Sequence, residues 1–191
     1  MRPLLFISYC AFSTLTSILN KFALTLFPDA TVLVALQYLF TCSCIFGAAQ
    51  FQLVALLLDR VKVVNNLTGI VAIAIFFHAA IWSGSKVILF GNIETFLAFR
   101  GLVPLIVALV VRIRGERKVR VSIGLSLAII ALSGFGFIMW DDKFNLSAYL
   151  WGILCLLSIV AETVLIKDVY EKVNFTAWEM SFLNNLLSFF F

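Results

Sequence analysis

The sequence predicts an all-α membrane protein of about seven transmembrane helices, with no soluble domain attached. Apolar residues make up 63% of the 191 residues, charged residues make up 13%, and the mean hydropathy is +1.09. A soluble domain carries roughly 25% charged residues. The apolar residues fall in blocks near the ~20 residues that span a bilayer. Because the bilayer core holds no water to bond the backbone, each block must be helical.

The first three helices are expected at residues 4–27, 31–58 and 67–85. The first is too long for the apolar region of a signal peptide, and Asn20 and Lys21 interrupt it late. The second has no formal charge and is longer than a bilayer requires, which favours a tilt or an extension past the membrane surface.

The last four helices are expected at residues 92–111, 121–140, 145–166 and 175–191. The first of these carries Glu94 and Arg100, and the third carries Glu162 near its end. Small residues gather in the helix at 121–140, where they permit close helix crossings. We treat residues 1–191 as a single transmembrane domain.

Basic residues concentrate at one set of helix ends. Ten of them lie at the N-terminus and in the even-numbered connections: Arg2, Arg60, Lys62, Arg112, Arg114, Arg117, Lys118, Arg120, Lys167 and Lys172. The odd-numbered connections hold only Lys143. The positive-inside rule therefore predicts a cytosolic N-terminus. The net charge of +4 reports this orientation and requires no nucleic-acid partner.

Three cations remain inside or at the ends of helices, namely Lys21, Lys86 and Arg100. A charge at the bilayer centre costs about 2.5–3.5 kcal/mol, so it usually faces a cavity or a partner. Arg100 lies near the middle of its helix, four residues before Pro104, which opens the backbone ladder beside it. Either Arg100 lines an anion-binding cavity or it pairs internally with Glu94 or Glu162. Lys21, with Asn20, is also deep enough to line a cavity.

Enzyme and metal chemistry have no support in the sequence. It contains no nucleophile elbow, no zinc-protease motif and no phosphate-binding glycine loop. Cys42 and Cys44 have no second cysteine pair and no histidine nearby, so no metal site is expected. We predict neither a catalytic residue nor a cofactor.

Four segments of the sequence resemble the motifs of one known family of membrane proteins. They are Ser-Ile-Leu-Asn-Lys at 17–21, which closes the first helix, and residues 95–104, with a basic residue four positions before a proline. The others are residues 141–152, between the fifth and sixth helices, and Trp-Glu-Met-Ser-Phe-Leu-Asn-Asn-Leu-Leu-Ser at 178–188. Together they resemble the nucleotide-sugar transporters of the drug/metabolite transporter superfamily. The last segment is the most specific, because it resembles the F-Y-N-N-x-L-S stretch of GDP-mannose and GDP-fucose transporters.

The resemblance implies contacts with a nucleotide sugar. In that subfamily the asparagine pair of this stretch contacts the solute, which implies the same role for Asn184 and Asn185, and for the flanking Ser188. Leu183 stands where the family has tyrosine. The amides and cations of the first and fourth helices complete the expected set. The expected substrate-binding residues are Asn184, Asn185, Ser188, Arg100, Lys21 and Asn20.

The resemblance also implies an antiporter of the Golgi membrane, or of the endoplasmic reticulum, that exchanges a nucleotide sugar for a nucleoside monophosphate. Ten helices form two five-helix inverted repeats in the family. The seven predicted helices correspond to the first repeat and two helices of the second, so we expect a C-terminally truncated chain that lacks the G-A-L-N-K motif. Two alternatives stay open. One is a non-transporting helix bundle that forms a homo-oligomer or joins a full-length relative, and the other is a carrier of another phosphorylated metabolite.

Overall fold

The structure is a computed structural model that describes residues 2–54, 60–115, 121–141, 144–173 and 175–191. Its helices are α1 (Arg2–Leu26), α2 (Ala30–Gln50), α3 (Arg60–Asn65), α4 (Leu67–Phe90), α5 (Ile93–Ile113), α6 (Val121–Met139), α7 (Leu146–Val173) and α8 (Ala177–Ser188). Over the described residues α2, α4, α5 and residues 146–169 of α7 are long and apolar enough to cross a membrane. The predicted all-α membrane fold is therefore confirmed, although the short helix α3 was not among the expected elements.

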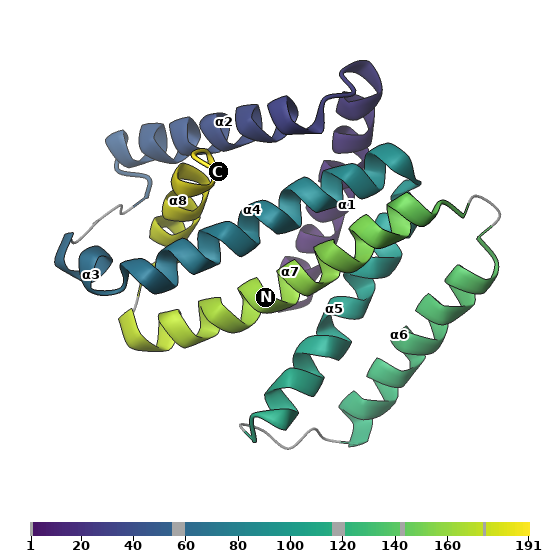
Figure 1. Ribbon diagram of the computed structural model, residues 1–191. Coiled ribbons are helices and arrows are strands. Elements are labelled where there is room, and N and C mark those ends of the chain that lie inside the picture. The colour runs from purple at the N-terminus through teal and green to yellow at the C-terminus, as the bar shows by residue number, and fades with distance from the viewer. Residues whose placement is uncertain (1, 55–59, 116–120, 142–143, 174) are drawn as a thin grey trace.

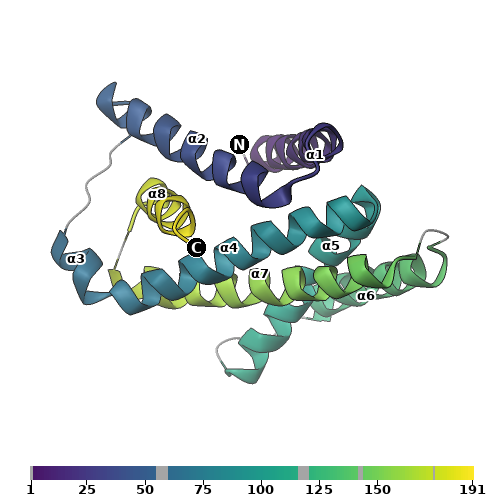
Figure 2. The same cartoon turned by 45° about the horizontal axis from the view of Figure 1, so that its top comes forward.

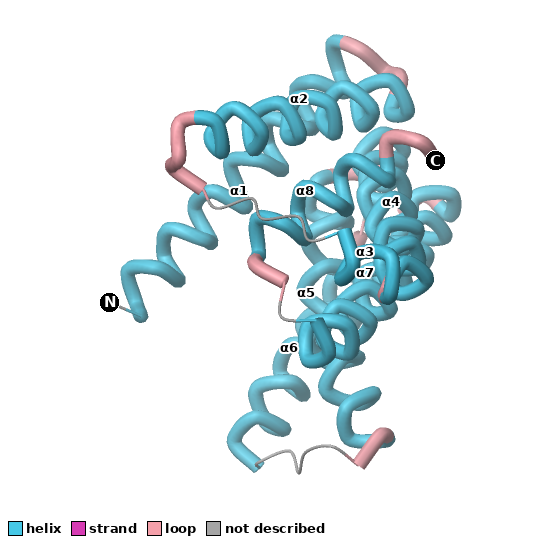
Figure 3. Tube along the Cα trace, turned by 90° about the vertical axis from the view of Figure 1, so that its left-hand side faces the viewer, coloured by secondary structure: helices cyan, strands magenta, loops and turns pink. Residues whose placement is uncertain are grey.

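Helices α4 and α7 lie side by side through the middle of the bundle (Figure 1). Helix α8 packs between α4 and α2, while α1 crosses α4 near the N-terminal end of α2 (Figures 1 and 2). The pair α5 and α6 lies on the opposite side from α2 (Figure 3). Helix α6 packs against α5, and its outward Leu125, Ile129 and Leu132 are 63%, 65% and 71% exposed. In water such a face would be unfavourable, so it suits contact with lipid.

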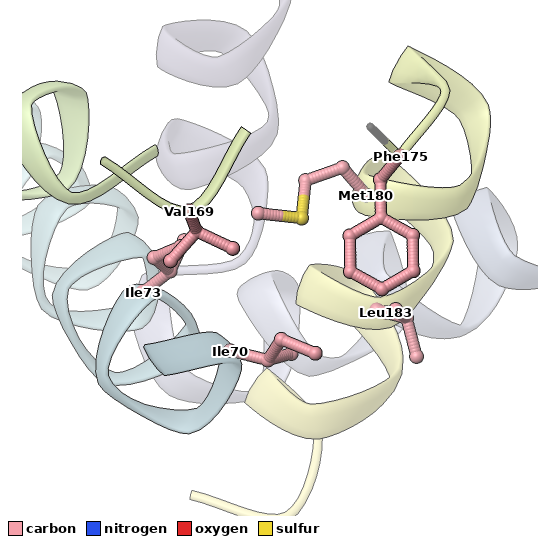
Figure 4. Packing of buried hydrophobic residues seen from close by; sticks show 6 residues of the cluster. All are labelled: Ile70, Ile73, Val169, Phe175, Met180 and Leu183. Carbon is pink, nitrogen blue, oxygen red and sulfur yellow. The ribbon is translucent and has the colours of Figure 1, made fainter. Parts of the chain in front are cut away.

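Two apolar clusters hold α7 to its neighbours. One joins α4, α7 and α8 (Figure 4), with Ile70, Ile73, Val169, Phe175, Met180 and Leu183 as its buried members. The other joins α5 to α7 through Phe99, Tyr149, Leu156 and Val160. In this second cluster Gly152 allows the close approach, because a Cβ there would lie 2.4 Å from two ring atoms of Phe99. The absence of a side chain at Gly152 thus sets how closely α5 and α7 pack.

Helix α2 ends at Gln50, whereas the sequence led us to expect helix up to residue 58. Gln52 adopts φ = 57°, its N–H donates to the Ala49 carbonyl, and the Leu53 N–H donates to the Ala48 carbonyl. This is the hydrogen-bond pattern of a Schellman C-cap. The expected extension over residues 55–58 falls outside the described residues.

Helices α4 and α7 are longer than expected at their C-terminal ends. Lys86, placed after the third helix by the sequence analysis, is helical, and its Nζ lies 5.4 Å from the ring centroid of Trp82 and 6.0 Å from that of Phe90. Helix α7 continues past the expected end at residue 166, and in this extension Asp168 accepts two hydrogen bonds from Arg114 Nη1, at 2.9 and 3.1 Å. Both extensions thus contain charged residues that contact aromatic rings or an ion-pair partner.

Helix α8 starts and stops inside the expected range of 175–191. It begins after Thr176, whose hydroxyl accepts from the Glu179 N–H while the Glu179 carboxylate accepts from the Thr176 N–H. This reciprocal capping box fixes the first turn. The helix ends at Ser188, and Phe189 to Phe191 follow in a turn.

The odd-numbered connections meet at one end of the bundle. Lys21 of α1 donates to the backbone carbonyl of Gly91, and Asn145, just before α7, donates to that of Phe90. Arg114 and Asp168 are joined at the opposite end. Odd-numbered and even-numbered connections thus lie at opposite ends of the bundle, as expected for helices that run alternately up and down. The charge count in the sequence assumes this topology. Of the basic residues in that count, Arg117, Lys118, Arg120 and Lys143 lie outside the described residues.

Candidate functional site

A cavity of about 390 Å³ lies among α1, α2, α4, α5 and α7. We call it the polar cavity because Asn20, Gln37, Arg100 and Glu162 contribute side chains to its wall. The remaining lining residues are Thr16, Phe77, Ala80, Ile81, Gly84, Ser85, Ile88, Phe96, Cys155 and Ile159. Polar groups on an otherwise apolar wall are typical of small-molecule sites.

Helical periodicity brings these residues to one space. On α4 the lining positions Phe77, Ile81 and Ser85 recur every four residues, so they share one face. On α5 the same spacing places Phe96 one turn from Arg100. On α7 Cys155 and Glu162 are two turns apart on one face.

Arg100 and Glu162 face the polar cavity without pairing. Arg100 is exposed, Glu162 is partly buried, and within the described part of the chain Arg100 forms no ion pair with Glu162 or with Glu94. Pro104 lies inside the same helix and cannot donate a backbone N–H to the Arg100 carbonyl. Of the two interpretations of Arg100, the arrangement favours the one in which the guanidinium lines a cavity.

An amide pair forms another part of the wall. Gln37 Nε2 of α2 donates to Asn20 Oδ1 of α1 at 2.8 Å. This bond leaves the Asn20 amide N–H groups and the Gln37 carbonyl oxygen available as a donor and an acceptor. The sequence predicts Asn20 as a site residue but gives no signal for Gln37, whose helix carries no formal charge.

Lys21 points away from the cavity, toward the end of α4. Its Nζ donates to the backbone carbonyls of Ile88 at 2.6 Å and Gly91 at 3.0 Å. The last carbonyls of a helix lack intrahelical partners and carry partial negative charge, so a lysine there stabilises the helix end. In this conformation Lys21 joins α1 to α4, and its expected contact with substrate stays a prediction.

The asparagine pair and the flanking serine lie on α8, outside the polar cavity. All three are buried. Asn185 Nδ2 donates to the Ser181 carbonyl at 2.8 Å, and Ser188 Oγ donates to the Ala74 carbonyl at 3.0 Å. Asn184 Oδ1 is buried without a hydrogen-bond partner among the described residues. A buried acceptor left unpaired costs about 1–3 kcal/mol, which makes Asn184 a candidate for ligand binding.

A second cavity of about 790 Å³ adjoins α8 and uses a different face of α4. We call it the aromatic cavity because Tyr38, His78, Trp82 and three phenylalanines line it together with Ser188. The Tyr38 hydroxyl and His78 Nδ1 are 3.3 Å apart, and Trp82 Nε1 donates to Thr31 Oγ1 at 3.3 Å. His78 is therefore a half-buried histidine on the wall of the aromatic cavity, in hydrogen-bond contact with the Tyr38 hydroxyl.

Sequence reasoning missed part of the site. Glu162 was considered only as an ion-pair partner of Arg100, because nothing in a single sequence shows which helices face each other. Gln37 stands out only as a neutral amide within a long apolar run, which is a weak signal. The two cavities arise from neighbouring faces of α4, an arrangement set by tertiary packing.

Two curated proteins match the chain over nearly its whole length. GDP-fucose transporter 1 of Arabidopsis thaliana is 31% identical over 96% of this chain and 53% of its own length. The GDP-mannose transporter GONST3 of the same plant is 29% identical over 93% of this chain and 47% of its own length. The chain thus spans about half the length of these relatives. No family model and no solved structure matches the chain. The similarity to the GDP-fucose and GDP-mannose transporters confirms the resemblance to the nucleotide-sugar transporter family that the sequence motifs predict.

Proposed function

We propose that this chain takes part in carrying a nucleotide sugar, with a GDP-sugar as the solute, across a membrane. The observation that carries the proposal is the match of nearly the whole chain to two proteins named as GDP-sugar transporters. We further propose antiport against a nucleoside monophosphate, in a Golgi membrane or in the endoplasmic reticulum, with the N-terminus in the cytosol. The ten basic residues on one set of helix ends support this orientation.

Arg100 is the proposed contact for the diphosphate. A GDP-sugar carries two negative charges, and a guanidinium offers planar, paired donors that suit phosphate oxygens. Arg100 lines the polar cavity and has no carboxylate partner among the described residues. Because an unpaired cation within a membrane is costly, an anionic solute supplies the charge that the protein leaves out.

The amides are the proposed contacts for the hydroxyls and the base of the solute. Asn20 lies beside the cavity with its amide N–H groups free of the Gln37 bond. Asn184 has a free buried acceptor, and Asn185 and Ser188 share its helix. We propose that α8 brings these three residues to the solute in a second conformation, as alternating access requires. Lys21 would assist by holding α1, and with it Asn20, against the end of α4.

Exchange in liposomes tests the proposal. The purified chain is reconstituted into vesicles loaded with GMP, and uptake of radiolabelled GDP-mannose and GDP-fucose is compared with uptake of UDP-galactose. We expect uptake of a GDP-sugar that depends on internal GMP. If the folded chain exchanges none of these, transport is not its own activity. Uptake of a triose phosphate instead would indicate a carrier of another phosphorylated metabolite.

A matched pair of variants tests the role of Arg100. Arg100→Ala should raise the half-saturation concentration for GDP-mannose at least tenfold, because a charged hydrogen bond worth about 1.5–3 kcal/mol is lost. Arg112→Ala is the control, since Arg112 lies on the same helix but outside the polar cavity. Equal half-saturation for wild type and Arg100→Ala would contradict the phosphate contact.

The second candidate function is the alternative that the sequence leaves open, a non-transporting helix bundle that acts by joining a longer relative or a second copy of itself. Co-purification of differently tagged copies, and of the chain with a full-length GDP-sugar transporter, measures this directly. A monodisperse monomer that exchanges GDP-mannose would exclude the need for a partner.

A further inference from the structure

Glu162 presents an acid to the same cavity as Arg100. It lies on α7 two turns from Cys155, on the face that lines the polar cavity. Within the described residues it has no ion-pair partner. The nearby Tyr38 hydroxyl is directed to His78 Nδ1 instead, at 3.3 Å. A carboxylate in this cavity would repel the phosphates of the solute. Glu162 is therefore expected to contact a part of the solute that carries hydrogen-bond donors.

We propose that Glu162 recognises the guanine base, an inference that rests on the proposed transport of a GDP-sugar. Guanine presents N1–H and the exocyclic N2 amine as neighbouring donors on one edge, and a carboxylate has two oxygens that accept both. On the corresponding edge, adenine and cytosine place a ring-nitrogen acceptor beside the amine, and uracil places carbonyl acceptors beside its N–H. Each of these bases would set an acceptor against a carboxylate oxygen. Glu162 therefore selects guanine over the other three bases.

The rest of the polar cavity suits one end of a nucleotide. The rings of Phe77 and Phe96 line it and provide apolar surface against which a flat base can stack. Arg100 comes from a different helix than Glu162, so the phosphates and the base can be bound by different walls. The volume of about 390 Å³ is near the lower end of the range of about 300–1,000 Å³ for small-molecule sites, which fits a base and its phosphates.

The substrate analogue IMP isolates the proposed contact because it lacks only the N2 amine of GMP. Binding to the purified chain in lipid nanodiscs is measured by displacement of radiolabelled GDP-mannose with GMP or IMP. For the wild type we expect GMP to bind at least ~10-fold more tightly than IMP. IMP lacks the N2 amine, so one carboxylate oxygen of Glu162 is left without its hydrogen bond. Glu162→Gln, which keeps the shape but offers a single acceptor, should reduce this ratio to below ~3.

Control variants make the test decisive. Glu94→Gln changes an exposed acid on α5 outside the polar cavity and should leave the GMP-to-IMP ratio unchanged. If Glu162→Gln binds no GDP-mannose, Glu162→Asp, which keeps the carboxylate, should retain the ratio at weaker affinity. A wild-type chain that binds no GDP-sugar overturns the proposed function. If the wild-type chain binds GDP-mannose, two results would overturn the role of Glu162 without affecting the proposed function. One is a GMP-to-IMP ratio that stays unchanged in Glu162→Gln, and the other is a ratio that is lost in Glu162→Asp.

Discussion

Replacing Gly152 by alanine should weaken the packing of α5 against α7. An added Cβ would lie 2.4 Å from two ring atoms of Phe99 and 2.9 Å from a third, while carbon atoms in contact prefer about 3.5–4.0 Å. Phe99 cannot easily retreat, because it is 7% exposed and its ring meets that of Tyr149 edge-on at 5.6 Å. Over-packing of this kind costs about 1–3 kcal/mol, and alanine recovers about 1 kcal/mol of helix propensity. With so severe an overlap we expect a net loss of about 2 kcal/mol, the upper end of that difference.

The free energy of unfolding in mixed micelles, titrated with SDS and followed by tryptophan fluorescence, measures this loss. Gly101→Ala is the matched control, since nothing lies within 4 Å of a Cβ at that position of α5. Adding Phe99→Leu to Gly152→Ala should return part of the loss, as a coupling of about 0.5–3 kcal/mol between contacting residues. If Gly152→Ala and Gly101→Ala unfold at the same SDS concentration, the close approach of α5 and α7 described above is incorrect.

Three further predictions use the same unfolding titration or the liposome assay. Lys21→Met should lower the free energy of unfolding by about 2–3 kcal/mol, because it removes charged hydrogen bonds to two carbonyls. Lys86→Met, the control, loses only ring contacts worth about 0.5–1 kcal/mol. Equal losses for the two variants would contradict the role of Lys21 at the end of α4. Gln52→Gly should stabilise the chain by about 1 kcal/mol by relieving the left-handed backbone, and a loss of stability would count against that C-cap. Asn184→Ala combined with Asn185→Ala should abolish GDP-sugar uptake, and undiminished uptake would refute their role.

Hydropathy was sufficient to predict the class of fold, because the requirement to satisfy backbone groups in lipid leaves a helix as the only choice for each block. It did less well at helix ends. Nothing in the apolar run around Gln52 signals a left-handed cap, since the usual glycine is absent. A lysine after an apolar run predicts a helix end at Lys86, but Lys86 lies one turn from both Trp82 and Phe90, so the cation stays in the helix over their rings.

The candidate site was only partly predictable for a related reason. Because Arg100 and Lys21 are both charged residues in apolar helices, the sequence predicts both equally as cavity-lining residues. In the structure, Lys21 donates to two backbone carbonyls, whereas Arg100 lines a cavity. The difference depends on which helix lies beside each residue, and a single sequence does not specify that. The same limit hid the pairing of Gln37 with Asn20.

The two charges in the polar cavity support a binding role more strongly than a structural one. Insertion of Arg100 and Glu162 costs about 2.5–3.5 kcal/mol for each on translocon scales, which is a large share of the roughly 5–15 kcal/mol by which proteins are stable. If these residues served folding, a direct ion pair or apolar replacements would lower that cost. The described structure holds them on one cavity wall each without such a pair. A solute with an anionic centre and a donor-rich base supplies the missing partner for both, and this is why we assign Arg100 and Glu162 to opposite ends of the same nucleotide.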